Sequence, residues 1–95
     1  MKLFGWHIPV YRKGATVILA DGACARGRTA ERLFACLDPG SQFKRNLYGS
    51  PKRGAKGRIV SLMKVKDAAG ASYIYYGVLV KDVLYAVEES RLARA

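Results

Sequence analysis

Cations and aromatic rings alternate within residues 41–58, "SQFKRNLYGSPKRGAKGR", a stretch with six Lys and Arg, three glycines and no acid. Lys and Arg neutralise phosphates and release counterions, and an aromatic ring can stack on an unpaired base. The glycines would let the backbone come close to a ligand. We therefore expect this stretch and the strand that follows it to contact a polyanion. The candidate nucleic-acid-binding residues are Lys44, Arg45, Tyr48, Lys52, Arg53, Lys56, Arg58, Lys64 and Lys66.

The charge of the whole chain favours the same kind of partner. Seventeen Lys and Arg stand against seven Asp and Glu, which gives a formal net charge of +10 and an isoelectric point near 10.0. The excess is regional, because no acid occurs between Asp38 and Asp67. A field of this sign attracts polyanions, of which nucleic acid is the commonest. The alternatives are an acidic protein surface, an anionic membrane, or a solvated loop whose charge only keeps the chain soluble.

A second motif could bind phosphate by another route. The spacing G-x-x-x-x-G-[KR]-[ST] of a phosphate-binding loop is matched by Gly22, Gly27, Arg28 and Thr29. Such a loop normally carries Lys and follows a strand of a parallel sheet, which needs long crossover connections. A chain of 95 residues with one helix candidate can hardly supply that sheet. We expect the two glycines to serve turn geometry, with anion binding at the helix N-terminus as the alternative.

The other chemically active side chains do not form a catalytic set. His7 is the single histidine, and the neighbours Glu88 and Glu89 would point to opposite faces of a strand. Acid–base catalysis needs paired titratable groups, and a structural zinc needs about four ligands. We therefore expect a protein that is not an enzyme and has no catalytic residue, metal or cofactor.

Cys24 and Cys36 bear on the compartment of the protein. The N-terminal sequence "MKLFGWHIPV" lacks the long apolar run of a signal peptide, so we expect a cytoplasmic location in which thiols stay reduced. Both side chains are then predicted to be small buried hydrophobes. A disulfide between them is the alternative.

Tyrosines gather in the C-terminal third of the chain. Alternation along a strand places Tyr73 and Tyr75 on one face and Tyr76 on the other, and Tyr85 follows in the next strand. Packing in and around a core is the first interpretation. An aromatic face that binds a base or a partner is the second.

The first half of the chain predicts one arm, one strand and one helix. Residues 1–12 form an edge strand or an extended arm, because Pro9 cannot donate to a strand ladder. Residues 15–20 form a β-branched strand that ends in a turn. Residues 28–40, "RTAERLFACLDPG", form a helix that Thr29 caps and Pro39 ends. The apolar face of this helix consists of Ala30, Leu33, Phe34 and Leu37.

Three antiparallel strands are predicted after a basic loop at residues 41–57. Alternation in residues 57–67 places Ile59, Ser61, Met63 and Val65 on one face and Val60, Leu62, Lys64 and Lys66 on the other. A hairpin loop then leads to residues 72–80, and a tight turn leads to the last strand. That strand carries Val83, Tyr85 and Val87 on one face, and Leu92 returns to the core.

These elements indicate a mainly β fold in a single domain, residues 1–95, because a chain of this size has one core. Four to five short antiparallel strands tend to close on themselves, so we expect a small barrel with the helix inserted in its first long loop. The segments "KGATVILADG", "KGRIVSLMKVK", "YIYYGVLV" and "VLYAVEESRL" resemble the strand series of SH3-like small β-barrels. The opening "MKLFGW" is similar to the starts of small phage-encoded proteins.

Two functions follow from these observations. The first is a basic module that contacts DNA or RNA mainly through phosphates, with little sequence specificity, because the helix carries few polar side chains that could read bases. The second is a phage virion or assembly protein, or an inhibitor that docks on an acidic surface of a host protein, with homo-oligomers or virion neighbours as partners. The location would be the host cytoplasm or the virion. We do not expect a membrane partner, and no apolar segment approaches the roughly 20 residues that a membrane span requires.

Overall fold

The computed structural model describes residues 2–3, 6–7 and 9–95, with side chains from Pro9 onward. This part of the chain is mainly β, with one α-helix, α1 (Gly27–Leu37), and one short 3-10 helix, η1 (Glu89–Arg91). Six strands form the main sheet, which is mixed because β4 runs parallel to β7 while the other neighbours are antiparallel. The strands are β3 (Thr16–Leu19), β4 (Lys44–Arg45), β5 (Lys56–Lys66), β6 (Ser72–Val80), β7 (Val83–Glu88) and β8 (Leu92–Arg94).

The sheet is open. Its strand order is β4-β7-β6-β5-β3-β8, and the two end strands do not pair with each other. The succession of β5, β6 and β7 by antiparallel pairing confirms the prediction for the last third of the chain. The parallel strand β4 differs from the prediction, because composition alone assigns this segment to the basic loop. Two residues are too few to show a strand period, and the pairing with β7 is a tertiary contact.

The N-terminal segment forms a separate ribbon. β1 (Lys2–Leu3) pairs antiparallel with β2 (Trp6–His7), and neither strand belongs to the main sheet. The described backbone of β1 and β2 is thus compatible with the predicted N-terminal arm and not with an edge strand of the main sheet. Residues 1, 4, 5 and 8 of the predicted arm lie outside the described residues, as does the side chain of His7.

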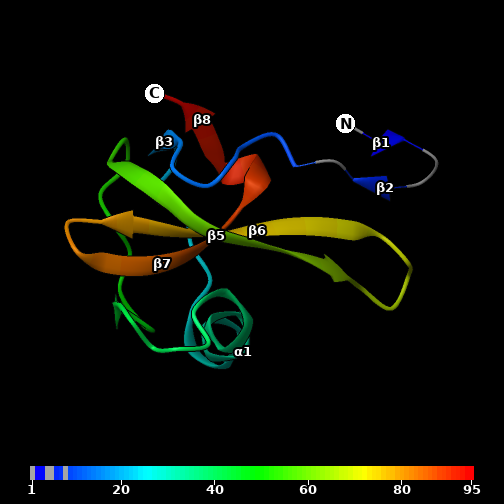
Figure 1. The fold of residues 1–95 in the computed structure, drawn as a ribbon, viewed down its shortest axis with the longest axis horizontal. Helices are drawn as coiled ribbons and strands as arrows, with labels where there is room; N and C mark the ends of the chain where they lie inside the picture. The colour runs from blue at the N-terminus through cyan, green and yellow to red at the C-terminus, as the bar shows by residue number, and fades with distance from the viewer. Residues whose placement is uncertain (1, 4–5, 8) are drawn as a thin grey trace.

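The central layer of β5, β6 and β7 is covered on both sides. Figure 1 shows α1 below this layer and β3, β8 and η1 above it. The upper side holds the inner core, in which β3 and β8 pack onto β6 and β7 through side chains such as Val17, Tyr76, Val87 and Leu92. The prediction that Leu92 returns to the core is confirmed, as is the shared face of Val83, Tyr85 and Val87.

The lower side holds the helix-side core. The predicted apolar face of α1, from Ala30 to Leu37, is buried against Leu84 and Ala86 of β7. Phe34 is fully buried. Burial of a side chain of this size contributes about 1.5–3 kcal/mol, so docking on the sheet stabilises a helix that is too short to persist alone.

A β-bulge at Val60 divides β5. The register on β6 shifts there, so that Ile59 lies opposite Val78 and Ser61 lies opposite Gly77. Adjacent residues of β6 face opposite sides, so Ile59 packs in the inner core and Met63 in the helix-side core. The predicted common face of Ile59, Ser61, Met63 and Val65 is therefore wrong. So is that of Val60 and Leu62, because the extra residue inverts the alternation in mid-strand.

The helix begins earlier than its sequence predicts. Its N-cap is Arg26, and no side chain caps it, so the prediction of a Thr29 cap is wrong. The Gly27 N–H donates instead to the carbonyl of Leu47, at 2.7 Å, which supplies an acceptor from the distant basic segment. The predicted end is confirmed: α1 stops before Pro39, and the Asp38 N–H donates to the carbonyl of Phe34.

A polar network ties the segment after the N-terminal ribbon to the inner core. The Tyr76 hydroxyl donates to Glu89 at 2.6 Å, and the N–H groups of Val10 and Tyr11 donate to Glu89 and to the Tyr76 hydroxyl. Burial, reinforced by the bond to Glu89, raises the pKa of Tyr76. The Tyr11 ring meets that of Tyr76 edge to face, with centroids 5.6 Å apart.

Across the residues that the structure describes, no helix has both the length and the apolar character needed to cross a membrane.

Candidate nucleic-acid interface

A groove opens at one end of the inner core, between the basic segment and the β6–β7 turn. Its volume is about 680 Å³, against at most 360 Å³ for four other hollows on the molecule. Residues 50–56 form one wall, and Val80, Lys81, Val83 and Tyr85 form the rest. Tyr85 and Val80 are 8% exposed, so the floor is the apolar edge of the inner core.

The rim of this groove is positive. Four exposed cations line it, and no acidic side chain of the described chain does so. These cations are Lys52, Arg53, Lys56 and Lys81. A concave surface with charges of one sign over an apolar floor concentrates the field that attracts an anion.

Lys52 and Arg53 are held by a turn that is fixed to β3, and Lys56 begins β5 directly after this turn. The Ala55 N–H donates to the carbonyl of Lys52 at 3.0 Å, which closes the turn. Leu19 of β3 brackets it, because its carbonyl accepts the Gly54 N–H and its N–H donates to Ala55. The basic segment is therefore hydrogen-bonded to the sheet at the point where its charge is densest.

Gly22 lies directly under this turn. Its φ is +72°, and a Cβ at this position would lie 2.8 Å from the carbonyl oxygen of Pro51. Only glycine combines that backbone conformation with so close an approach. Turn geometry is thus one role of this glycine, as the sequence predicts, and support of the basic wall is the other.

The fourth cation comes from the β6–β7 hairpin. Lys81 and Asp82 both have positive φ, 47° and 66°, as in the two-residue turns that match the twist of a hairpin. The sequence predicts this turn but does not connect it with the basic segment. Lys81 is therefore a candidate that sequence reasoning missed, because β6 and β7 reach the groove only through the folding of the sheet.

Two further predicted residues flank the groove. Lys44 is exposed on β4, beside Val83, which lines the groove. Arg58 is exposed two residues beyond Lys56, so both side chains leave the same face of β5. Together with Lys52, Arg53 and Lys56, they place five of the predicted cations at or beside one end of the molecule.

Tyr48 lies two residues before the wall of the groove. Its side chain is 77% exposed, compared with 45% for Val10 and 37% for Tyr73, the other large apolar side chains that are exposed in the described part. Asn46 fixes the backbone at this position, because its Oδ1 accepts the N–H groups of Tyr48 and Gly49. The ring is thus presented to solvent by an ordered turn.

Arg45 is directed at Asp38 and does not line the groove. Its guanidinium donates to the carbonyl of Asp38, lies 3.5 Å from that residue's carboxylate and stands over the Phe34 ring at 5.3 Å. Its side chain is 25% exposed, and its charge is directed inward at Asp38. The prediction that Arg45 contacts a ligand therefore has no support in the geometry.

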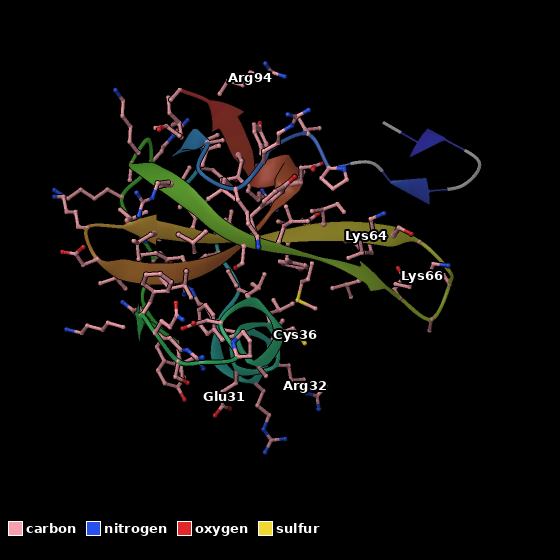
Figure 2. All side chains as sticks on the ribbon, in the orientation of Figure 1. Glu31, Arg32, Cys36, Lys64, Lys66 and Arg94 are labelled. Atoms are coloured by element: carbon pink, nitrogen blue, oxygen red, sulfur yellow. The ribbon has the colours of Figure 1, made fainter. Side chains whose placement is uncertain are left out.

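Lys64 and Lys66 lie at the far end of β5. Figure 2 shows both toward the tip of the β5–β6 hairpin, at the opposite end of the sheet from the β6–β7 turn. At about 3.3 Å per residue, Lys66 lies roughly 30 Å from Lys56 along the strand. The structure thus divides the predicted site, and these two lysines are not neighbours of the groove.

The motif Gly22, Gly27, Arg28 and Thr29 does not lie in the structural context of a phosphate-binding loop. The strand before the motif, β3, is antiparallel to both of its neighbours, and the Gly27 N–H is already bonded to the carbonyl of Leu47.

The thiols of Cys24 and Cys36 are both free. Cys36 is exposed, contrary to the prediction, because it lies on the solvent side of α1. Cys24 is half-buried, and burial raises the pKa of its thiol.

Among the described residues, no group of three or more His, Cys, Asp or Glu is placed to hold a metal ion. No protein-family model, curated protein or solved structure matches this chain.

Proposed function

We propose that this protein is a basic binding module that holds nucleic acid through its phosphates, with little sequence specificity. The observation that carries the proposal is the groove, where four exposed cations from two separate segments form a rim without an acidic side chain. The net charge of +10 supplies the long-range attraction that brings a polyanion to this rim. Base reading by α1 is not expected, since the helix lies on the opposite side of the sheet from β3 and β8 (Figure 1).

A salt titration tests the proposal. Binding of a fluorescent 20-nucleotide DNA or RNA should fall steeply as salt rises, because each neutralised phosphate releases counterions. Replacing Lys52, Arg53, Lys56 and Lys81 by Ala should lower the magnitude of the slope of log K against log salt by about 2.8 to 3.6, since each phosphate that is no longer neutralised reduces it by about 0.7 to 0.9. Absence of binding by the unaltered protein at low salt would refute the proposal.

A matched variant separates a site from a general charge effect. Arg32, Lys64, Lys66 and Arg94 are exposed and lie away from the β6–β7 turn that borders the groove (Figure 2), and their replacement by Ala removes the same four charges. This variant should keep most of the affinity and most of the salt slope. Equal reductions of affinity in the two variants would mean that net charge, and not the groove, governs binding.

The alternative partner is an acidic protein surface, in the context of a phage virion, an assembly intermediate or an inhibited host protein. The apolar floor of the groove favours it, because protein interfaces combine an apolar centre with a polar rim. Poly-glutamate of matched charge provides the comparison. Competition by poly-glutamate as effective as that by an oligonucleotide would favour the acidic protein over nucleic acid.

The fold enters the proposal as well. We regard the open six-stranded sheet, curled so that β3 and β8 cover β6 and β7, as a relative of the SH3-like small barrels. The support is the succession of β5, β6 and β7, together with an inner core that one face of the curled sheet encloses. A pairing between β4 and β8 in solution, detected by NMR, would strengthen this assignment.

A further inference from the structure

The groove combines a cationic rim with an apolar floor, and the phosphates of a duplex would contact only the rim. Its rim is cationic, but its floor is formed by apolar atoms of Val80, Val83 and Tyr85. Its volume of about 680 Å³ lies within the range of sites that enclose small organic groups, about 300–1,000 Å³. A ligand that suits such a surface carries flat apolar groups next to negative charges, as a chain of unpaired nucleotides does.

Resting on the proposed function, we infer that the ligand class is single-stranded nucleic acid, with an unpaired base stacked on Tyr48 and the adjoining phosphates on the groove rim. A base in a duplex is stacked on its neighbours and cannot offer its face to a protein ring. An unpaired base can, and base–aromatic stacking tolerates any sequence.

Tyr48 is suited to stacking by its exposure. A tyrosine that stabilises the fold is normally covered, as Tyr76 is in the inner core, but Tyr48 is 77% exposed. Tyr85 cannot replace it, because it is 8% exposed and its ring is largely committed to the inner core. Removal of Tyr48 should therefore cost the fold little.

The turn that carries Tyr48 is held from both sides. Asn46 accepts the N–H groups of Tyr48 and Gly49, at 3.2 and 2.7 Å. From the segment before α1, the Cys24 thiol donates to the carbonyl of Gly49, and the Arg26 guanidinium donates to the Ser50 hydroxyl. A ring on such a turn loses less freedom on binding than one on an untied loop, which favours stacking.

The residue that carries the ring is also close in the chain to the wall of the groove, so one short strand could reach both. Tyr48 is two residues from Ser50, a wall residue, so their Cα atoms are separated by at most about 7 Å. One or two nucleotides span such a distance. The cations at the rim would therefore meet the phosphates next to the stacked base.

The experiment compares three ligands of equal length and known charge: a 12-nucleotide oligo(dT), an abasic 12-mer with the same phosphates, and a 12-base-pair duplex. At one salt concentration, the unaltered protein should bind oligo(dT) about 5- to 150-fold more tightly than the abasic strand, the range that stacking of a base supplies. Tyr48→Ala should remove this preference and leave the affinity for the abasic strand and the duplex unchanged. Tyr48→Phe should keep it, since the ring remains.

Tyr73→Ala serves as the control, because Tyr73 is an exposed tyrosine on β6 at the far end of the molecule. It should leave the preference for oligo(dT) intact. Equal binding of oligo(dT) and the abasic strand, or a preference that survives Tyr48→Ala, would overturn the inference while leaving phosphate binding in place. Failure of the unaltered protein to bind any of the three ligands at low salt would instead remove the proposed function itself.

Discussion

At the scale of single residues, Asp38 shows how one buried charge organises the start of the basic segment. It is 4% exposed, and its two carboxylate oxygens accept the N–H groups of Gln42 and Phe43. Arg45 completes the site from seven residues away in sequence. Arg45 belongs to the basic segment in sequence, but its guanidinium pairs with the buried Asp38 because that acid directly precedes the segment.

The charge of Asp38 should stabilise the fold. Burial acts to raise the pKa of this carboxyl, but the two backbone donors and the Arg45 guanidinium outweigh burial and hold the pKa below its ordinary 3.8. Asp38→Asn places an amide where one of the N–H donors needs an acceptor, and hydrogen bonds to a charged group contribute about 1.5–3 kcal/mol. We expect a loss of about 2–3 kcal/mol in the free energy of urea unfolding at pH 7.

The pH dependence has a definite sign. The pKa is lower in the folded state, so the stabilisation by ionised Asp38 is fully present above pH 3.8 and is lost as pH falls through the folded pKa. The stability difference between the unaltered protein and Asp38→Asn should therefore be constant from neutral pH to about pH 5 and shrink below pH 3.8. Glu31→Gln, on the exposed side of α1, is the control and should change stability by less than about 0.5 kcal/mol. A difference that grows on acidification would contradict the assignment.

At the scale of elements, the wall of the groove depends on the junction between β3 and the turn at residues 52–55. Three features form it: the two hydrogen bonds of Leu19, the turn bond from Ala55 to Lys52, and the close approach of Gly22 to Pro51. The positive wall is therefore positioned by the strand that precedes α1, although a helix and a long segment separate the two in sequence.

Gly22→Ala tests this junction, and Gly14→Ala is its matched control. Both glycines have positive φ, +72° and +88°, but a Cβ at Gly14 meets no atom within 4 Å, whereas one at Gly22 meets the Pro51 carbonyl at 2.8 Å. Gly14→Ala should cost about 1 kcal/mol for the left-handed backbone alone. Gly22→Ala should cost about 1–3 kcal/mol more, because the Cβ displaces the turn. It should also weaken oligonucleotide binding.

Chemical denaturation and oligonucleotide titration of the two variants provide the measurement. Equal losses in the free energy of unfolding would show that the turn moves away from the added Cβ at residue 22 without destabilising the fold. Unchanged binding by a Gly22→Ala protein that remains folded would show that the junction does not position the cations.

At the scale of the whole molecule, the excess of cations opposes folding while it favours binding. Seventeen positive side chains and seven negative ones repel one another on balance, and salt screens that repulsion over about 10 Å at 0.1 M. The same screening weakens the attraction of nucleic acid. Stability and affinity should therefore respond to salt in opposite directions.

We expect the midpoint of thermal unfolding to rise between 10 and 300 mM NaCl (about one and a half decades of salt). Relief of about 1 kcal/mol of repulsion corresponds to about 4–8 °C for a domain of this size. The variant of Lys52, Arg53, Lys56 and Lys81 to Ala should show a smaller rise, because it carries less charge to screen. A midpoint that falls with salt would mean that attractive ion pairs, such as Arg91 with Asp21 at 2.7 Å, outweigh the repulsion.

Much of this molecule could be predicted from local sequence. The period of Ala30, Leu33, Phe34 and Leu37 predicts the buried face of α1, and strand alternation predicts the faces of β7. The excess of positive charge follows from the amino-acid composition alone. These features are set by residues that are near one another in the chain, or by composition, so the sequence determines them directly.

Only the tertiary structure decided how these parts meet. The bulge at Val60 inverts the faces of β5, and the pairing of β4 with β7 comes from a two-residue strand without a detectable period. Folding also pairs Arg45 with the buried Asp38 and places Lys64 toward the far end of the sheet, and it brings Lys81 to the groove. The physical reason is that each of these outcomes depends on contacts between segments distant in sequence, which no local period records.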